Sequence, residues 1–269
     1  MKNFFFFTAW PMVPPAPYSF FHITFTIIGT AAAFLAARFL SSRTDKFRPL
    51  SVLFFSGLLL AVSEAYKQGF LYTVVNSHSF DWWYFPFQLC SVPMYLCLLY
   101  PFFAAGRYKK ILDIFATFIQ DFGILGGIMA LVEPSGLMHP YWTLTIHGFL
   151  WHFFLIFLGL YCCFCHISDN SPIGFKQVIP LFFICCIIAS LINITSGPNR
   201  NADMFYISPY YPSLQVVFHT ISLHIGILPG NLIYLACVCI GAWIIHKGCS
   251  SRKNYRGLSK NVSKAQKYL

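Results

Sequence analysis

The sequence predicts an all-α, polytopic membrane protein with seven transmembrane helices, an N-terminus outside and a C-terminus in the cytoplasm. Of its 269 residues 57% are hydrophobic and only 10% are charged. A soluble domain of this length cannot bury so much apolar surface and still present a wettable exterior. The apolar residues also gather into long runs, and the basic residues lie between those runs. The bilayer is therefore the solvent for most of the chain.

Each apolar run is about 20 residues long, the length that a helix needs to cross a bilayer. The breaks between the runs carry turn-forming and charged residues, such as Glu133-Pro134-Ser135-Gly136. The last run is long enough to include a re-entrant start. The spans are expected at residues 18–40, 50–76, 84–105, 110–132, 140–165, 177–196 and 214–246.

The basic residues predict the orientation. Fifteen of the 18 lysines and arginines follow the first, third, fifth or seventh run, and an excess of positive charge marks cytoplasmic loops. Only Lys2 and Arg200 fall on the other side, while Lys67 lies within the second run. We expect residues 1–246 to form one transmembrane domain and residues 247–269 to form a basic cytoplasmic tail without fixed structure.

The same charge pattern bounds the partners. A net charge of +10 does not indicate nucleic acid here, because the basic residues do not share one face; contact with anionic lipid is at most a secondary role. No pair of the ten cysteines has zinc-site spacing. We expect no metal, no cofactor and no nucleic acid, and a location in a membrane, the plasma membrane if the source is bacterial. The oligomeric state is left open.

Cys90 and His147 are the candidate catalytic residues. A helical rise of about 1.5 Å per residue puts Cys90 about 9 Å and His147 about 10 Å below the outer boundary of the membrane. A thiol and an imidazole at one depth can form a nucleophile and base pair. The plainer alternatives are an inert apolar cysteine and a histidine that joins two helices.

Other polar residues fall in the same outer half of the membrane. By the same rise His219 lies roughly 8 Å and His224 about 15 Å deep. Gln88 and Asn193 complete this polar layer, and either amide could donate to an oxyanion. The layer predicts a cavity open to the outer leaflet, with oxyanion-binding or substrate-binding roles for Gln88, Asn193, His219 and His224.

Three charged residues lie within predicted spans, where an unpaired charge is costly. Glu64 and Lys67 are three residues apart and can pair on one helix face. Asp121 needs a partner, either Lys67 or a histidine. It precedes Gly123, Gly126 and Gly127, which permit close helix packing.

Several short motifs, taken in order, resemble the YwaF-like family of bacterial membrane proteins and its animal relatives, known as transmembrane protein 164. The matching stretches lie between roughly residues 20 and 246. They are Phe85-Pro86-Phe87-Gln88-Leu89-Cys90-Ser91, Phe122-Gly123-Ile124-Leu125-Gly126-Gly127, Glu133-Pro134, Ile146-His147-Gly148, Leu191-Ile192-Asn193 and Asn201-Ala202-Asp203-Met204-Phe205-Tyr206.

The resemblance implies an acyltransferase that acts on phospholipid. The animal members build ether phospholipids with a cysteine that takes up the acyl chain and a histidine. By this resemblance Cys90 is the acyl-accepting nucleophile and His147 its base. The chain departs from the family pattern at Glu133, where a threonine is common before the proline, and at the additional aromatic residue Phe87; substrate preference is open at these positions.

Two alternatives use other chemistry. A lipid-ester hydrolase would use the same pair with water as the acceptor. A small-molecule transporter would use Glu64, Lys67 and Asp121 together with proline-broken helices, although no inverted repeat is visible. A seven-helix receptor has little support because the last run carries no retinal-type lysine.

Overall fold

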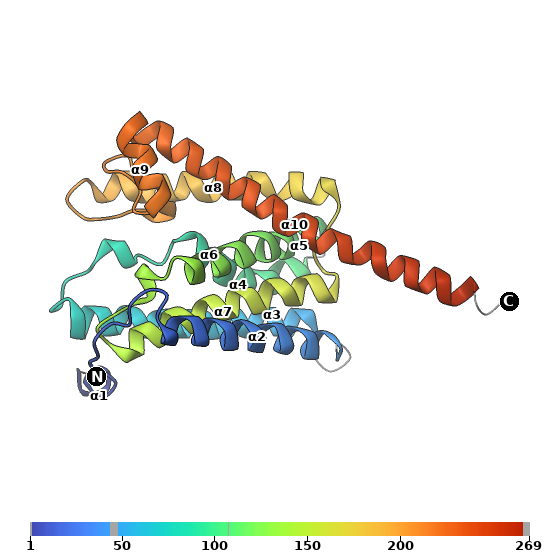
Figure 1. Ribbon diagram of the computed structural model, residues 1–269, viewed down its shortest axis with the longest axis horizontal. Helices are drawn as coiled ribbons and strands as arrows, with labels where there is room; N and C mark the ends of the chain where they lie inside the picture. The colour runs from blue at the N-terminus through green and yellow to red at the C-terminus, as the bar shows by residue number, and fades with distance from the viewer. Residues whose placement is uncertain (1, 44–47, 107, 266–269) are drawn as a thin grey trace.

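The apolar runs fold into helices because a bilayer offers the backbone no hydrogen-bond partners of its own. The computed structural model describes residues 2–43, 48–106 and 108–265, and the side chains of residues 4–43, 48–106 and 108–250. Its long helices lie roughly antiparallel to one another (Figure 1). No strand occurs in these described ranges; the single β-bridge joins Pro11 and Tyr141.

Six helices of the described chain are long and apolar enough to cross a membrane. Two contain π-helical segments: η1 (Leu71–Val75) ends the helix that begins with α3, and η4 (Ile119–Gly123) joins α5 to α6. The six are α2 (Phe20–Ser41), α3 (Pro49–Phe70) with η1, the run of α5 (Lys109–Phe118), η4 and α6 (Ile124–Val132), α7 (Trp142–Cys165), α8 (Pro172–Ser196) and the first part of α10 (Ile227–Ala265).

The predicted third span is shorter than expected. Instead of starting near residue 84, its α-helix α4 (Val92–Ala105) starts eight residues later, after the 3-10 turns η2 (Trp82–Tyr84) and η3 (Leu89–Ser91). Prolines explain the later start. Pro86 has no backbone N–H to donate to a helical hydrogen bond, and Pro93 occupies the first turn of α4, where proline is favoured. The apolar helix Leu89–Ala105 thus falls below the length of the other six.

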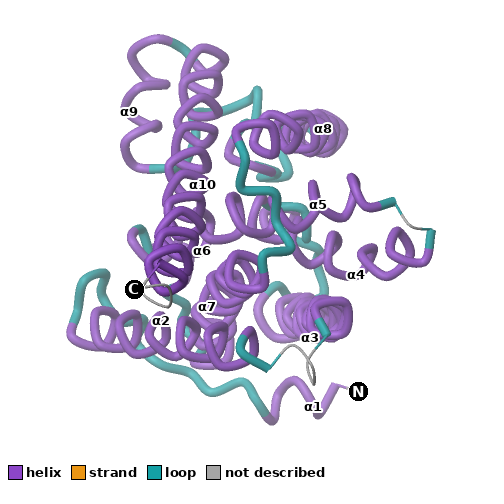
Figure 2. Tube along the Cα trace, turned by 90° about the vertical axis from the view of Figure 1, so that its right-hand side faces the viewer, coloured by secondary structure: helices purple, strands orange, loops and turns teal. Residues whose placement is uncertain are grey.

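The predicted last span is broken into a helical hairpin. Gly226 has φ +95°, a conformation that favours glycine, and separates α9 (Val216–Ile225) from α10. The two helices pack side by side (Figures 1 and 2). A Cβ atom on Gly230 would lie 2.1 Å from the Ser222 hydroxyl oxygen, so the hairpin also needs this glycine. The sequence had allowed a re-entrant start here.

Helix α10 continues through Ala265, past residue 246 where the span was expected to end. A helix satisfies its own backbone hydrogen bonds in water as well as in lipid. The C-terminal part of α10 projects from one end of the bundle, and α1 (Lys2–Phe7) lies at the opposite end (Figure 1).

Helix α7 is the centre of the bundle. In the most apolar 18-residue stretch of α7, 72% of the residues are buried. The corresponding share is 67% for the run from α5 to α6 and 17–33% for the other four spans. α7 packs against α2, α3 and α6. The outer helices turn large apolar side chains outward, such as Phe20 at 85% and Leu232 at 68% exposure. This inside-out distribution suits contact with lipid tails.

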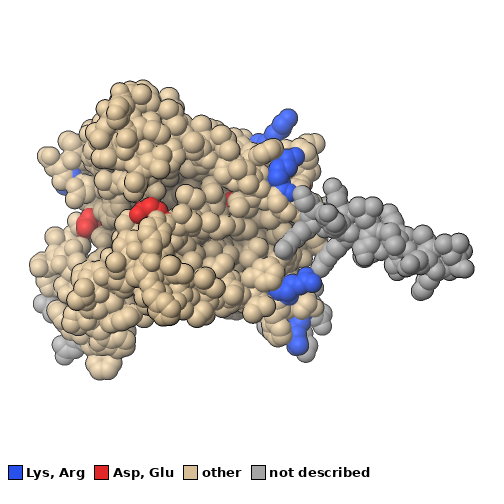
Figure 3. All heavy atoms as spheres, in the orientation of Figure 1, with Lys and Arg blue, Asp and Glu red and all other residues tan. Residues whose placement is uncertain are grey.

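Basic side chains gather at the end of the bundle from which α10 projects (Figure 3). The described ones at helix ends there include Arg38 on α2, Lys109 on α5 and Lys176 on α8. Lys46, Arg107 and Lys267, which the predicted orientation also counts, lie outside the described residues.

Close contact between α6 and α7 depends on one of two adjacent glycines. A Cβ atom on Gly127 would lie 2.7 Å from Ile156 Cγ1 and 2.9 Å from the His152 carbonyl oxygen, whereas one on Gly126 would meet nothing within 4 Å. We expect Gly127→Ala to destabilise the protein by about 1–3 kcal/mol through overpacking and Gly126→Ala to have little effect. Thermal unfolding of both variants in detergent tests this, and equal unfolding temperatures would contradict the packing.

Candidate functional site

Cys90 sits where an irregular segment becomes a helix. It lies in the turn η3, directly before α4, and its side chain is partly buried. The indole nitrogen Nε1 of Trp151 on α7 donates a hydrogen bond of 3.2 Å to the Cys90 carbonyl oxygen. The thiol is also close to the Ser91 hydroxyl. The backbone of Cys90 is therefore anchored to the central helix α7, and this bond leaves its sulfur free to react.

His147 lies on α7, one turn before Trp151, and the two rings stack with centroids 5.7 Å apart. The imidazole lies near the backbone of Ser63 on α3. Its Nε2 atom is buried and has no hydrogen-bond partner among the described residues. Buried polar atoms are rarely left unpaired, so Nε2 is a position from which a proton can be accepted or donated.

The structure brings Cys90 and His147 into one cluster through shared neighbours. Trp151 touches both residues, and the Lys67 ammonium is close enough to interact electrostatically with both. Within the described chain the thiol and the imidazole make no direct hydrogen bond to each other. Sequence reasoning named the pair but missed Trp151, whose only signal was its position four residues after His147.

Glu64 and Lys67 pair as their spacing predicted, with a distance of 2.9 Å between Lys67 Nζ and Glu64 Oε1. Gln68 Nε2 donates to the same carboxylate oxygen at 2.8 Å and also to the Tyr84 carbonyl oxygen. The Tyr84 hydroxyl hydrogen bonds to His139 Nε2 at 2.8 Å. Gln68 thus joins α3, with its ion pair, to the irregular segment that leads to Cys90.

Gln88 and Asn193 hold the turn η6 (Met204–Tyr206), which follows α8. Gln88 Nε2 donates to the Asp203 carbonyl oxygen at 2.9 Å, and its Oε1 accepts from the Phe205 backbone at 2.8 Å. Asn193 bonds both the N–H and the carbonyl of Met204, at 2.7 and 3.1 Å. Each amide uses its oxygen and one of its N–H groups on this turn.

The remaining predicted residues of the outer layer lie elsewhere. His219 and His224 are both on α9. His219 Nδ1 bonds the Ser213 carbonyl oxygen at 3.0 Å, and His224 Nδ1 bonds the Thr220 carbonyl oxygen at 2.8 Å. In the described part of the molecule neither ring hydrogen bonds to Cys90 or His147. The hairpin break at Gly226 explains this, because it removes α9 from the continuous span that set their expected depths.

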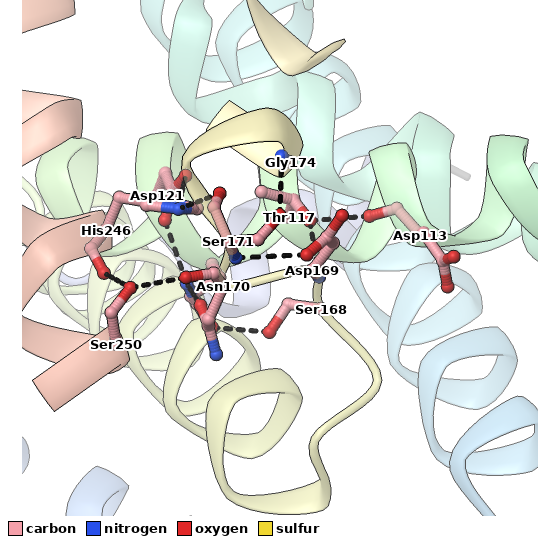
Figure 4. Close-up of polar contacts among 11 residues, drawn as sticks. Asp113, Thr117, Asp121, Ser168, Asp169, Asn170, Ser171, Gly174, His246 and Ser250 are labelled. Carbon is pink, nitrogen blue, oxygen red and sulfur yellow. Dashed lines mark hydrogen bonds and ion pairs between the residues drawn. The ribbon is translucent and has the colours of Figure 1, made fainter. Parts of the chain in front are cut away.

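Asp121 meets His246, with a distance of 2.8 Å between Oδ2 and Nδ1. Both residues are buried, and Asp121 lies in the π-helical segment η4 (Figure 4). His246 Nε2 bonds the Ser171 carbonyl oxygen at 3.0 Å, and Gln120 Nε2 bridges Asp121 Oδ1 at 2.9 Å and Asn170 Oδ1 at 2.7 Å. Sequence reasoning foresaw a histidine or Lys67 as the partner without identifying which one.

Further hydrogen bonds around Asp121 join η4 to the connection between α7 and α8. The Ser250 hydroxyl donates to the carbonyl oxygens of Asn170 and His246, and the Ser168 hydroxyl donates to Gln120 Oε1. This network therefore ties α10 to the basic end of the bundle and lies apart from the Cys90 cluster, at the opposite end of α4 and α7.

Asp203, in the connection between α8 and α9, is a buried carboxylic acid that sequence reasoning quoted in a motif but gave no role. Its Oδ1 accepts from the Ser208 backbone at 2.8 Å, while its buried Oδ2 has no partner among the described residues. Burial raises its pKa from 3.8 to about 7, and the Ser208 N–H opposes this in part. The carboxyl group therefore takes up a proton near neutral pH.

This shift predicts a pH dependence of stability. A carboxyl group whose pKa is raised on folding stabilises the folded state below its unfolded pKa, and that stability is lost as pH rises through the folded pKa. Between pH 5 and pH 8 the free energy of unfolding should fall by on the order of 2–3 kcal/mol. Asp203→Asn should reduce this fall, measured by thermal unfolding in detergent, whereas the control Asp81→Asn should retain it.

Comparison with known families gives a match to the TMEM164 family. Its model matches residues 17–247, which includes the whole Cys90 cluster and the long helices except the C-terminal part of α10. No curated protein and no solved structure matches the chain at a significant level. Because the match covers most of its length, this multi-pass membrane protein belongs to the TMEM164 family.

Proposed function

We propose that the protein is an integral membrane acyltransferase that acts on phospholipid, with Cys90 as the acyl-accepting nucleophile and His147 as its base. The observation that carries the proposal is the unpaired, buried Nε2 of His147, on a ring that stacks on the Trp151 side chain anchoring Cys90. Catalytic hydrogen bonds commonly tighten only when substrate binds, so the missing direct bond fits an unliganded state.

In the first half-reaction His147 takes the proton of the Cys90 thiol, and the sulfur attacks the carbonyl carbon of a lipid ester. The tetrahedral intermediate collapses as the bond from carbon to the ester oxygen breaks. The departing alkoxide then recovers the proton from the imidazolium, which leaves an acyl thioester on Cys90 and a lysolipid. The Lys67 ammonium is within electrostatic range of the sulfur and attracts the thiolate that this step needs, and its partner Glu64 opposes this in part.

In the second half-reaction His147 removes a proton from an acceptor hydroxyl, which attacks the thioester carbonyl and releases the thiol. A lysophospholipid as acceptor makes the protein a transferase, and water makes it a hydrolase. The outer helices present large apolar side chains to the membrane, which suits a substrate whose acyl chains lie in the bilayer. Phospholipid is therefore the proposed partner.

We also propose that α4 completes a seventh crossing, with the N-terminus outside and the basic end of the bundle in the cytoplasm. An odd number of crossings suits the position of α1 and the end of α10 at opposite ends of the bundle (Figure 1). The basic side chains at the end from which α10 projects support the orientation (Figure 3).

The acyl thioester tests the proposed chemistry. The protein purified from native membrane, or incubated with phospholipid, should carry an acyl mass that neutral hydroxylamine removes. Cys90→Ser should abolish the adduct, and His147→Ala should lower its rate of formation by about 10²–10⁴-fold. Cys97→Ser is the matched control, since Cys97 lies on α4, directly after the turn that carries Cys90, but is fully buried. Intact-mass analysis gives the readout.

The acceptor distinguishes transferase from hydrolase. Labelled lysophospholipid that gains the acyl chain supports the transferase, and free fatty acid supports the hydrolase. No adduct in any form would remove Cys90 from the mechanism and leave the buried charges Glu64, Lys67 and Asp121 as candidates for transport.

The proposed topology can be read from reporter fusions. A fluorescent protein that matures only in the cytoplasm should fluoresce when fused after residue 250. The same protein inserted into the connection 133–141 should stay dark, while a reporter enzyme that is active only outside should be active there. The opposite pattern at both positions would contradict the orientation.

A further inference from the structure

Two tyrosines, one in the turn η6 and one on α10, lie within electrostatic range of the Cys90 sulfur. The hydroxyl groups of Tyr206 and Tyr234 are close enough to interact electrostatically with it. Tyr206 is also tied to the segment that carries Cys90, because its ring packs on Trp83 and because Gln88, two residues before Cys90, bonds the backbone of Asp203 and Phe205. Neither tyrosine has a part in the nucleophile and base steps above.

The backbone around Tyr206 is strained and held in place. Phe205 and Tyr206 have φ angles of 60° and 57°, in the left-handed region that residues with side chains rarely adopt. Such residues cost on the order of 1–3 kcal/mol each and persist only where the surroundings enforce them. Gln88 and Asn193 supply that support through four hydrogen bonds to residues 203–205. Gln88 is two residues from Cys90, so the brace also fixes the turn relative to the sulfur.

The Tyr206 ring and hydroxyl are oriented as well. The ring packs edge-on against Trp83, with centroids 5.8 Å apart, and against Tyr234 at 6.3 Å. The hydroxyl lies near the Gln215 side chain. Burial raises the pKa of Tyr206, which lies in the connection between α8 and α9, so its hydroxyl keeps its proton. A neutral phenol of this kind can donate a hydrogen bond in a site with little water.

Acyl transfer to a thiol puts a negative charge on the carbonyl oxygen in the tetrahedral intermediate, and fixed donors aimed at that oxygen lower the barrier. Gln88 and Asn193 were the donors expected from the sequence, but their oxygens and one N–H group of each hold the turn. We propose that Tyr206 is a catalytic residue that donates a hydrogen bond from Oη to this oxyanion, with Gln88 and Asn193 as positioning residues. The proposal rests on the proposed acylation of Cys90.

Two reactions of the same sulfur test the proposal. Acylation by a phospholipid ester passes through an oxyanion, whereas alkylation by iodoacetamide displaces iodide at a saturated carbon and needs no oxyanion donor. We expect Tyr206→Phe to slow acylation of Cys90 by about 10²-fold and to leave alkylation of Cys90 within about twofold of wild type. Both rates are measured on the Cys90 peptide by mass spectrometry.

Matched controls use tyrosines with other placements. Tyr210→Phe removes a hydroxyl that bonds the Ile194 carbonyl oxygen from the same connection, and it should leave both rates unchanged. Tyr234→Phe, on α10 rather than in the turn that Gln88 holds, should slow acylation less than Tyr206→Phe.

Three outcomes would overturn the proposal. Acylation of Tyr206→Phe at the wild-type rate removes the oxyanion role, and so does an equal fall in acylation and alkylation, which marks a structural effect on Cys90. A wild-type protein that takes up no acyl group overturns the proposed function and this inference together. If Tyr206→Phe does not fold, a fluorinated tyrosine at position 206, a stronger donor, should speed acylation, and an unchanged rate would contradict the proposal.

Discussion

Lipid offers no hydrogen bonds, and this single constraint shapes the whole structure. Backbone groups in the membrane must pair within helices, and each buried polar side chain must find a partner or serve a purpose. The protein meets the demand with two polar clusters set into an apolar bundle. One surrounds Asp121 and His246 at the basic end, and the other surrounds Cys90 at the opposite end. Helix α7, the most buried of the six long helices, runs between them.

The two clusters differ in how completely they are paired. At the basic end Asp121, His246 and Gln120 use their polar atoms on each other and on the connection between α7 and α8 (Figure 4). A satisfied network of this kind specifies one arrangement of helices. At the other end His147 Nε2 and Asp203 Oδ2 are buried without partners among the described residues. Unpaired buried atoms are costly, so this end of the bundle is less completely paired than the basic end.

Irregular backbone is concentrated on the Cys90 side. The segment from η2 to η3 delays α4, the α9–α10 hairpin replaces one long span, and residues 205 and 206 adopt left-handed conformations. Non-helical backbone at membrane depth is tolerated where it is enclosed by protein. Gln88, Asn193 and Gln68 bond this irregular backbone to the surrounding protein. The cost of this irregular structure is consistent with a site that needs groups from several segments around one sulfur.

The sequence alone determined that the chain is helical and membrane-bound, because apolar runs of about 20 residues have few other outcomes. The sequence also determined the Glu64–Lys67 pair, because two residues three positions apart meet on one face of the same helix. Only the tertiary structure decided which helices are neighbours, and so which partner Asp121 takes and what Gln88 and Asn193 hold. Depth in a span, the only coordinate that the sequence supplies, says nothing of rotation or of contacts between helices. His219 and His224 were placed by depth in an unbroken span, whereas the turn at Gly226 put them on a separate helix.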